Sequence, residues 1–256
     1  MPREVRSQRL EAIVLKHSKF GEADQLLTVY SRERGKVRAL AKGARKARSR
    51  KAGHLEPFTR VSLQIATGKS LDIVTQAEAQ DTHSPLSADL QLLGYASYVC
   101  ELVDKFTPDE DENRGVYRLL RETLERLESE SDAELVVRYY EVRLLDLVGF
   151  RPELQHCLQC GRAIQAEDQY FATQHGGVLC PRCGKSAAGA SPISMPALKY
   201  LRHFQRSDYA AAGHAQLSPS VRLELETLMD QYMTYVLERA LNSPRFLRRV
   251  RAEQKN

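Results

Sequence analysis

The period of the hydrophobic residues changes near residue 81, and this change constrains the fold more than any other feature. Before it, apolar residues alternate with polar or small ones, as Val61, Leu63 and Ile65 do. A period of two is typical of half-buried strands. The other candidate strands are 10–17, 25–30, 37–41 and 71–77. Several short strands in so short a segment predict a small barrel, and the OB-fold is the obvious candidate.

Beyond residue 81, apolar residues recur every three or four positions, which predicts amphipathic helices. The predicted helices cover 86–103, 116–127, 135–148, 197–204 and 221–241. Gly149 stands where a glycine commonly ends a helix. The acid-rich stretch 108–113 predicts a turn between two helices, and 184–196 predicts a flexible connection.

Four of the five cysteines form two Cys-x-x-Cys pairs separated by 19 residues. These residues are Cys157, Cys160, Cys180 and Cys183. Each pair lets two thiolates reach one ion, so the spacing predicts a zinc ion in a tetrahedral shell. Because such a shell leaves no position for water or substrate, we expect the zinc to be structural. Gly161 and Gly184 follow the pairs and are expected to let the backbone turn with positive φ.

Other interpretations of the cysteines have less support in the sequence. A redox motif needs one pair rather than two, and nothing else indicates an iron–sulfur cluster. His156 or His175 could replace a thiolate, although a surface position suits both. Cys100 falls in phase with Leu93 and Val103, and we expect it to be a small core residue.

Positive charge is concentrated near the N-terminus. Residues 1–80 hold 17 Lys and Arg against 8 Asp and Glu, whereas residues 81–152 hold 8 against 16. Such an asymmetry usually directs a basic surface at a polyanion, and we expect nucleic acid. The densest part is 32–51, with ten basic residues and one acid. Beyond Lys42 we expect a mobile loop that adds nothing to the core.

The residues that we expect to contact DNA are Lys36, Arg38, Lys42, Arg45, Lys46, Arg48, Arg50 and Lys51. They would neutralise phosphates without reading sequence. Few aromatic residues accompany them, so electrostatics rather than base stacking should dominate. A solvated loop is the plain alternative. A second basic run, 245–251, either joins this surface or forms an exposed charged tail.

The sequence lacks the motifs of common enzyme classes. It has no GxxxxGK[ST], HExxH, GxSxG or kinase motif. The acids at 109–112 lie in a predicted turn without spaced partner carboxylates, so a nuclease is not indicated. No apolar run is long enough to span a membrane, and the charged N-terminus lacks a secretory pattern. We therefore expect a cytoplasmic protein that is not an enzyme.

Two segments carry a resemblance to a known family. The first begins at Phe20 and reads FGEADQLLTVYSRERGKVRALAKGARKARSR. It resembles the N-terminal region of the bacterial recombination-mediator family RecO. The second begins at Glu141 and reads EVRLLDLVGFRPELQHCLQCG. It resembles the same family's junction between a helix end and the first cysteine pair. With the helical middle, the resemblance covers residues from about 8 to 240.

The resemblance implies an OB-fold, a helical domain and a zinc-binding insertion. It implies binding of single- and double-stranded DNA, annealing of complementary strands and, with the partner RecR, loading of RecA onto DNA coated by single-strand-binding protein (SSB). It also implies contact with the acidic C-terminal tail of SSB and a nucleoid-associated location. Arg118, Arg121 and Arg126 could serve that tail, but pairing with Glu122 and Glu125 is the default expectation.

Together these features predict an α+β chain: an N-terminal OB-fold β-barrel followed by an α-helical domain that carries a four-cysteine zinc-binding module. We expect the OB-fold at 1–80, helical segments at 81–152 and 191–256, and the zinc module at 153–190. The expected role is that of a DNA-binding recombination mediator in homologous recombination and DNA repair. The alternative is an RNA-binding or ribosome-associated factor with the same two modules.

Overall fold

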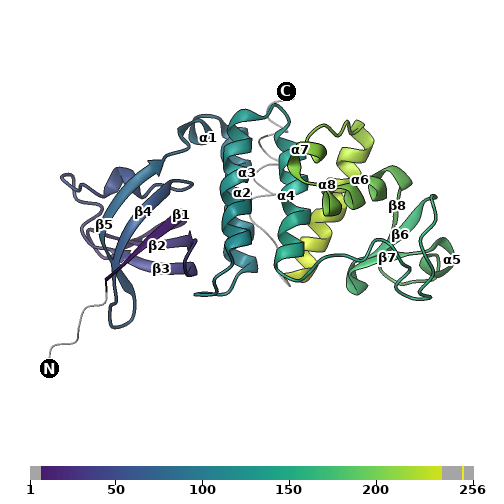
Figure 1. The fold of residues 1–256 in the computed structure, drawn as a ribbon, viewed down its shortest axis with the longest axis horizontal. Coiled ribbons are helices and arrows are strands. Elements are labelled where there is room, and N and C mark those ends of the chain that lie inside the picture. The colour runs from purple at the N-terminus through teal and green to yellow at the C-terminus, as the bar shows by residue number, and fades with distance from the viewer. Residues whose placement is uncertain (1–6, 238–249, 251–256) are drawn as a thin grey trace. The chain divides into compact units, whose positions relative to one another are not determined.

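In a computed structural model of the chain, residues 7–237 and Val250 are described. The chain forms two compact units, which divide between Ser131 and Asp132. Figure 1 shows the barrel and helices α1 to α3 of the first unit, and the helices and small sheet of the second. The change of hydrophobic period near residue 81 thus lies inside the first unit. Among the described residues, no helix is long and apolar enough to cross a membrane.

The first unit begins with a closed barrel. Its strands are β1 (Ser7–Phe20), β2 (Asp24–Ser31), β3 (Gly35–Ala41), β4 (Arg60–Ala66) and β5 (Asp72–Asp81). Their order is β1-β2-β3-β5-β4, and β1 closes the barrel by pairing with β4. β3 and β5 run parallel, whereas the other neighbours are antiparallel. This OB-like barrel, followed by helices, confirms the predicted fold class.

Alternation places one face of each strand in the barrel core. Val61, Leu63 and Ile65 of β4 are buried there, as their period of two predicted. Ala44, from the loop between β3 and β4, is buried in the same core. The expectation that the stretch beyond Lys42 adds nothing to the core is therefore wrong, because a side chain as small as alanine packs where the loop leaves the barrel.

Helices complete the first unit: α1 (Ser84–Ala88), α2 (Leu90–Phe106) and α3 (Arg114–Ser129). The helix predicted from residue 86 is interrupted at Asp89, whose carboxylate caps α2 by accepting from the N–H groups at 91 and 92. Asn113 caps α3 at the end of the predicted acidic turn. Cys100 on α2 is 2% exposed and burial raises the pKa of its thiol, as expected of a core residue.

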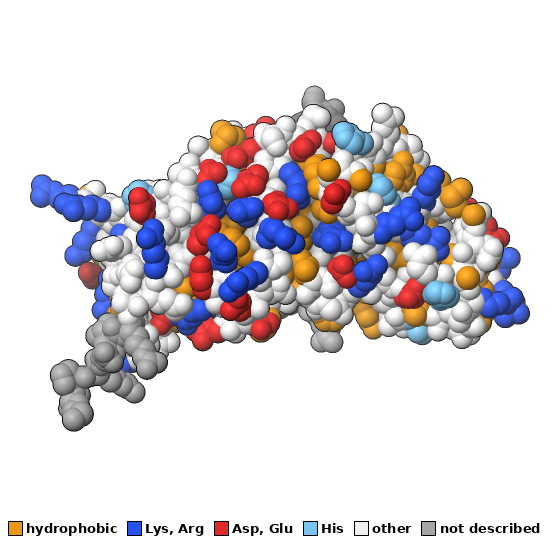
Figure 2. All heavy atoms as spheres, viewed as in Figure 1, with side chains coloured by type: hydrophobic (Ala, Val, Ile, Leu, Met, Phe, Trp, Pro, Cys, Tyr) orange, Lys and Arg blue, Asp and Glu red, His pale blue; other side chains and the backbone are white. Residues whose placement is uncertain are grey.

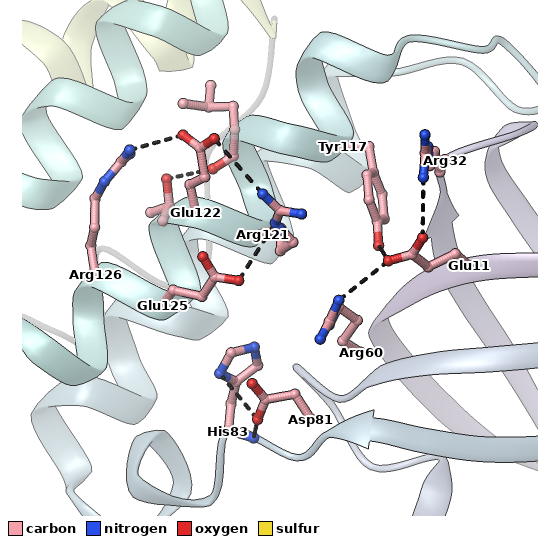
Figure 3. Close-up of polar contacts among 12 residues, drawn as sticks. Glu11, Arg32, Arg60, Asp81, His83, Tyr117, Arg121, Glu122, Glu125 and Arg126 are labelled. Carbon is pink, nitrogen blue, oxygen red and sulfur yellow. Dashed lines mark hydrogen bonds and ion pairs between the residues drawn. The ribbon is translucent and has the colours of Figure 1, made fainter. Parts of the chain in front are cut away.

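Polar contacts join the barrel to α3 (Figure 3). The Glu11 carboxylate on β1 accepts a 3.0 Å hydrogen bond from the Tyr117 hydroxyl on α3 and lies 3.4 Å from the Arg60 guanidinium on β4. Burial raises the pKa of Tyr117 and the Glu11 carboxylate raises it further, so the tyrosine stays a neutral donor. Just before α1, the buried His83 places Nδ1 2.9 Å from the Glu128 carboxylate.

The second unit combines helices with a small antiparallel sheet of order β7-β6-β8. Its helices are α4 (Ala133–Leu147), α5 (Pro181–Gly184), α6 (Met195–Arg206), α7 (Tyr209–Ala212) and α8 (Pro219–Val236). Its strands are β6 (Gln169–Ala172), β7 (Gly177–Leu179) and β8 (Ala190–Ile193). Gly149 follows α4 with a φ of 85°, as predicted for a helix end.

The segment 184–196 differs from the flexible connection that the sequence predicted. β8 pairs with β6, and Ile193 is buried. Ser194 caps α6, and its backbone N–H donates to the Glu224 carboxylate on α8 at 2.6 Å. A four-residue edge strand that contains Pro192 is hard to recognise from sequence, because its stability comes from partners elsewhere in the chain.

Candidate nucleic-acid interface and metal site

The basic stretch 32–51 runs from the β2–β3 turn through β3 and into the loop before β4. Its cations separate into two groups. Some bind other parts of the first unit, and others have no described partner. The separation matters because a cation that is already neutralised and buried contributes little to phosphate binding.

Lys36 belongs to the group that binds within the protein. It is only 6% exposed, and its Nζ donates to the backbone carbonyls of Asp104 at 2.7 Å and Thr107 at 2.6 Å. The same ammonium lies 3.4 Å from the Asp109 carboxylate. Because this ammonium is buried against the end of α2, it cannot also reach a phosphate, and we leave Lys36 out of the candidate interface.

Arg34 and Arg38 also face acidic residues. Arg34 Nη1 lies 2.8 Å from the Asp72 carboxylate, and its Nη2 pairs with Glu110. Arg38 Nη2 lies 3.1 Å from the Asp109 carboxylate. The Arg38 side chain is nevertheless 55% exposed and has further donors, so it can bind a second anion.

Arg45 and Lys51 attach the loop to the barrel. The Arg45 guanidinium donates to the carbonyls of Gly21 at 3.3 Å and Glu22 at 3.1 Å in the β1–β2 turn. Lys51 Nζ donates to the Val74 carbonyl on β5 at 3.1 Å. The two side chains thus attach the basic part of the loop, residues 42–51, to the barrel near its start and at its end.

Four exposed cations of the loop form no side-chain hydrogen bond or ion pair with any residue that the structure describes. These loop cations are Lys42, Lys46, Arg48 and Arg50. Lys and Arg side chains project from the barrel at the left of Figure 2. Of the residues predicted to contact DNA, the loop cations are the best placed to bind phosphates, because no described acid neutralises them. The run 245–251 lies outside the described residues, apart from Val250.

The four predicted metal ligands meet in the second unit. Cys157 and Cys160 lie in the loop after α4, Cys180 follows β7, and Cys183 lies on α5. Their Sγ atoms all lie within 4.8 Å of one another. The exposed His156 and His175 are not members of this described group. The four cysteines could therefore hold one metal ion without a histidine.

Backbone geometry positions the sulfur atoms. The Cys180 N–H donates to Cys157 Sγ at 3.3 Å. Gly161 has a φ of 71°, as predicted for the turn after the first pair. Gly184 does not have a positive φ, so that part of the prediction is wrong. It is required for another reason: a Cβ at this position would lie 2.3 Å from the Tyr170 ring.

Hydrogen bonds and burial shift the pKa values of the thiols in opposite directions. The Arg162 backbone N–H and then its guanidinium lower the pKa of Cys160 to about 6. Burial, followed by the neighbouring thiols, raises the pKa of Cys183 to about 12. A bound dication would favour the thiolate form of all four groups. Four sulfur donors supported by N–H groups and by Arg162 suit Zn²⁺, and they leave no ligand position for chemistry.

Arginines on α3 pair within their own helix. Arg121 Nε lies 3.5 Å from the Glu125 carboxylate, and Arg126 Nη2 lies 2.8 Å from that of Glu122 (Figure 3). The default expectation of surface pairs is thus confirmed for these two residues. Neither arginine supports a site for the SSB tail.

The structure places this chain in a class of proteins that join two parts. One part is an OB-like barrel with an exposed basic loop, and the other is a helical region with a four-cysteine cluster. The family model described as "Recombination protein O N terminal" matches residues 5–83, and "Recombination protein O C terminal" matches residues 87–245. The chain belongs to the RecO family. This membership supports a role in DNA repair and recombination, as the resemblance implied.

Relatives named "DNA repair protein RecO" match nearly the whole chain. One from Roseiflexus sp. (strain RS-1) is 40% identical over 246 residues, which are 96% of this chain and 87% of the relative. One from Pelotomaculum thermopropionicum is 37% identical over 241 residues, 94% of this chain and 93% of the relative. One from Dehalococcoides mccartyi (strain ATCC BAA-2266 / KCTC 15142 / 195) is 35% identical over 231 residues, 90% and 91% of the two chains.

Proposed function

We propose that this protein is a DNA-binding recombination mediator in homologous recombination and DNA repair. The observation that carries the proposal is the set of loop cations, which stand on an OB-like barrel without a described acidic partner. Single- and double-stranded DNA both present phosphates at their surface, so a basic loop of this kind binds both.

The proposed activity is annealing of complementary strands. Two strands repel each other through their phosphates. Weak contacts from lysine and arginine to these phosphates lower the repulsion without selecting a base sequence. The activity needs no nucleotide hydrolysis and no catalytic residue. The protein acts on bound DNA as a scaffold rather than as an enzyme.

Membership of the RecO family supports the proposed partners. With RecR, the protein helps to load RecA onto single-stranded DNA coated by SSB, and it contacts the acidic C-terminal tail of SSB. This work takes place in the cytoplasm, at the nucleoid. The four-cysteine group holds a structural Zn²⁺ that stabilises the second unit.

The decisive experiment is annealing of labelled complementary strands, with and without SSB and without ATP. The test variant is Lys42→Glu/Lys46→Glu, which reverses two loop cations. The matched control is Lys199→Glu/Arg206→Glu on α6, which changes the net charge equally on exposed residues of the second unit. We expect the test variant to lose about tenfold or more in DNA affinity and to anneal more slowly, whereas the control stays near wild type.

Two outcomes would contradict the proposal. If both variants annealed like the wild type, the loop would not be the DNA site. If the protein bound matched RNA oligomers far more tightly than DNA, the RNA-binding alternative would replace it. Labelled DNA incubated with the protein and Mg²⁺ should remain uncut, because the proposal includes no nuclease activity.

A further inference from the structure

One aromatic ring of the barrel is exposed, at the end of β1. Phe20 is 46% exposed, and within residues 7–81 no other large hydrophobic side chain is exposed. Isolated apolar residues are common on protein surfaces. The surroundings of this ring therefore decide what it can do.

The strand register places the ring on the outer face of the barrel. Leu27 of β2 points into the core, so Leu26 beside it points outward, as does its partner Leu40 on β3. Phe20 pairs with Asp24, two residues from Leu26, and so faces the same outward side. Leu26 and Leu40 are partly exposed. These three apolar side chains share the outer face of β1, β2 and β3, and we term them the apolar strip.

The basic loop is fastened beside this strip. The Gly43 N–H donates to the Asp24 carboxylate at 2.7 Å, and the Arg45 N–H donates to the Ala23 carbonyl at 2.9 Å. The Arg45 guanidinium holds the same β1–β2 turn through two more carbonyls. These bonds keep the turn that follows Phe20 within reach of the loop cations. An exposed ring and unneutralised cations thus share one end of the barrel.

We propose that Phe20 is a base-stacking residue that makes the interface prefer single-stranded over double-stranded DNA. This inference rests on the proposed function, because it assigns a second kind of contact to the same site. The loop cations bind the phosphates of a strand, and one of its bases lies on the Phe20 ring, with Leu26 and Leu40 extending the apolar surface. In a duplex the bases are stacked on one another and cannot lie on the ring.

The chain offers a direct probe of this contact because it contains no tryptophan. A Phe20→Trp variant has one indole, whose fluorescence is quenched when a base stacks on it. The matched control is Leu223→Trp on α8, where the side chain is 65% exposed in the second unit. Three oligomers of equal length serve as probes: oligothymidylate, an abasic deoxyribose-phosphate strand and a duplex.

We expect oligothymidylate to quench the Phe20→Trp variant, while the abasic strand and the duplex leave its emission nearly unchanged. The Leu223→Trp control should respond to none of them. In parallel, Phe20→Leu should lower the affinity for oligothymidylate by about 5- to 100-fold and leave that for the abasic strand unchanged. The salt dependence should not change, because no phosphate contact is lost.

Fluorescence anisotropy of labelled strands separates failure of this inference from failure of the proposed function. Wild-type binding to oligothymidylate without quenching of Phe20→Trp, or equal affinity of Phe20→Leu for both single strands, would overturn the stacking role and leave the DNA site intact. No binding of any strand by the wild type would overturn the proposed function, and the stacking role with it. Tm values near wild type show that the variants are folded.

Discussion

Lys36 Nζ on β3 lies 2.6 Å from the carbonyl oxygen of Thr107, the residue after the last turn of α2. The last carbonyls of a helix lack partners within the helix, and a cation is favourable there. In the middle of the most basic stretch of the chain, this lysine therefore joins the barrel to a helix. Charge density in a sequence cannot distinguish such a residue from one that faces solvent.

Replacing Lys36 with methionine should destabilise the first unit. The change keeps most of the apolar stem but leaves the carbonyls of Asp104 and Thr107 without their buried donor. We expect the free energy of unfolding to fall by about 2–4 kcal/mol, because each lost hydrogen bond to a charged group costs about 1.5–3 kcal/mol. Urea unfolding should show a lower midpoint with an unchanged m value.

The same variant, kept folded at low temperature, should retain the salt dependence of DNA binding. A urea unfolding midpoint equal to that of the wild type, together with a weaker salt dependence of DNA binding, would show instead that Lys36 contacts phosphate.

Alanine replacements of Lys42, Lys46, Arg48 and Arg50, made one at a time, should weaken DNA binding to a similar extent for different base sequences. Each removed phosphate contact should reduce the slope of log K against log salt by about 0.7 for single strands. Anisotropy titrations at several salt concentrations measure this slope. Lys199→Ala is the control, and a slope that fell equally in the control would argue against a localised site.

Removal of the metal should destabilise the second unit selectively. Four thiols that lose their ion are left close together, and the turns around Cys157 and Cys180 lose their common anchor. We expect a strong chelator to lower the Tm of a transition that involves the second unit. The barrel should keep its hydrogen-exchange protection, since its core contains none of these residues.

Elemental analysis before and after chelation provides the check, with about one zinc per chain expected beforehand. Cys160→Ser should behave like the chelated protein, and Cys100→Ser, outside the cluster, should retain the metal. Iron, or a folded metal-free protein of unchanged Tm, would refute the assignment.

Acid should weaken the contact between Asp132 and Arg222 in the second unit. Their hydrogen bond, 2.8 Å from Arg222 Nη1 to the Asp132 carboxylate, is the main cause that holds the pKa of Asp132 below its ordinary value of 3.8. A depressed pKa contributes stability that is present above the unfolded value and is lost as pH falls through the lower folded value. The loss should therefore begin only near and below pH 4.

Asp132→Asn keeps an oxygen to cap α4 and removes the charge. This change should lower the free energy of unfolding by about 1 kcal/mol or less at pH 7, because the pair is partly exposed. The difference from wild type should shrink as pH falls toward 3, as urea unfolding at several pH values can show. A difference that stayed constant over this range would mean that the charge makes no contribution.

Local sequence patterns were sufficient to predict the larger features of the fold. The period of two in β4 predicted a strand because neighbouring side chains must point to opposite faces. The period near 3.6 predicted α6 and α8 for the corresponding reason, although Asp89 showed that one cap can divide a continuous pattern. The cysteine spacing predicted the cluster because each pair brings two thiolates together within four residues.

By itself, then, the sequence determined the barrel, the helical region, the basic loop and the four-cysteine group, all of which follow from short-range spacing. Only the tertiary structure decided that Lys36 binds the end of α2, that Gly184 gives room to Tyr170, and that Phe20 lies exposed beside the loop cations. The physical reason is that burial, ion pairing and close contact depend on partners far away in the chain. A residue's chemical type limits what it can do, and its distant neighbours select which of those roles it takes.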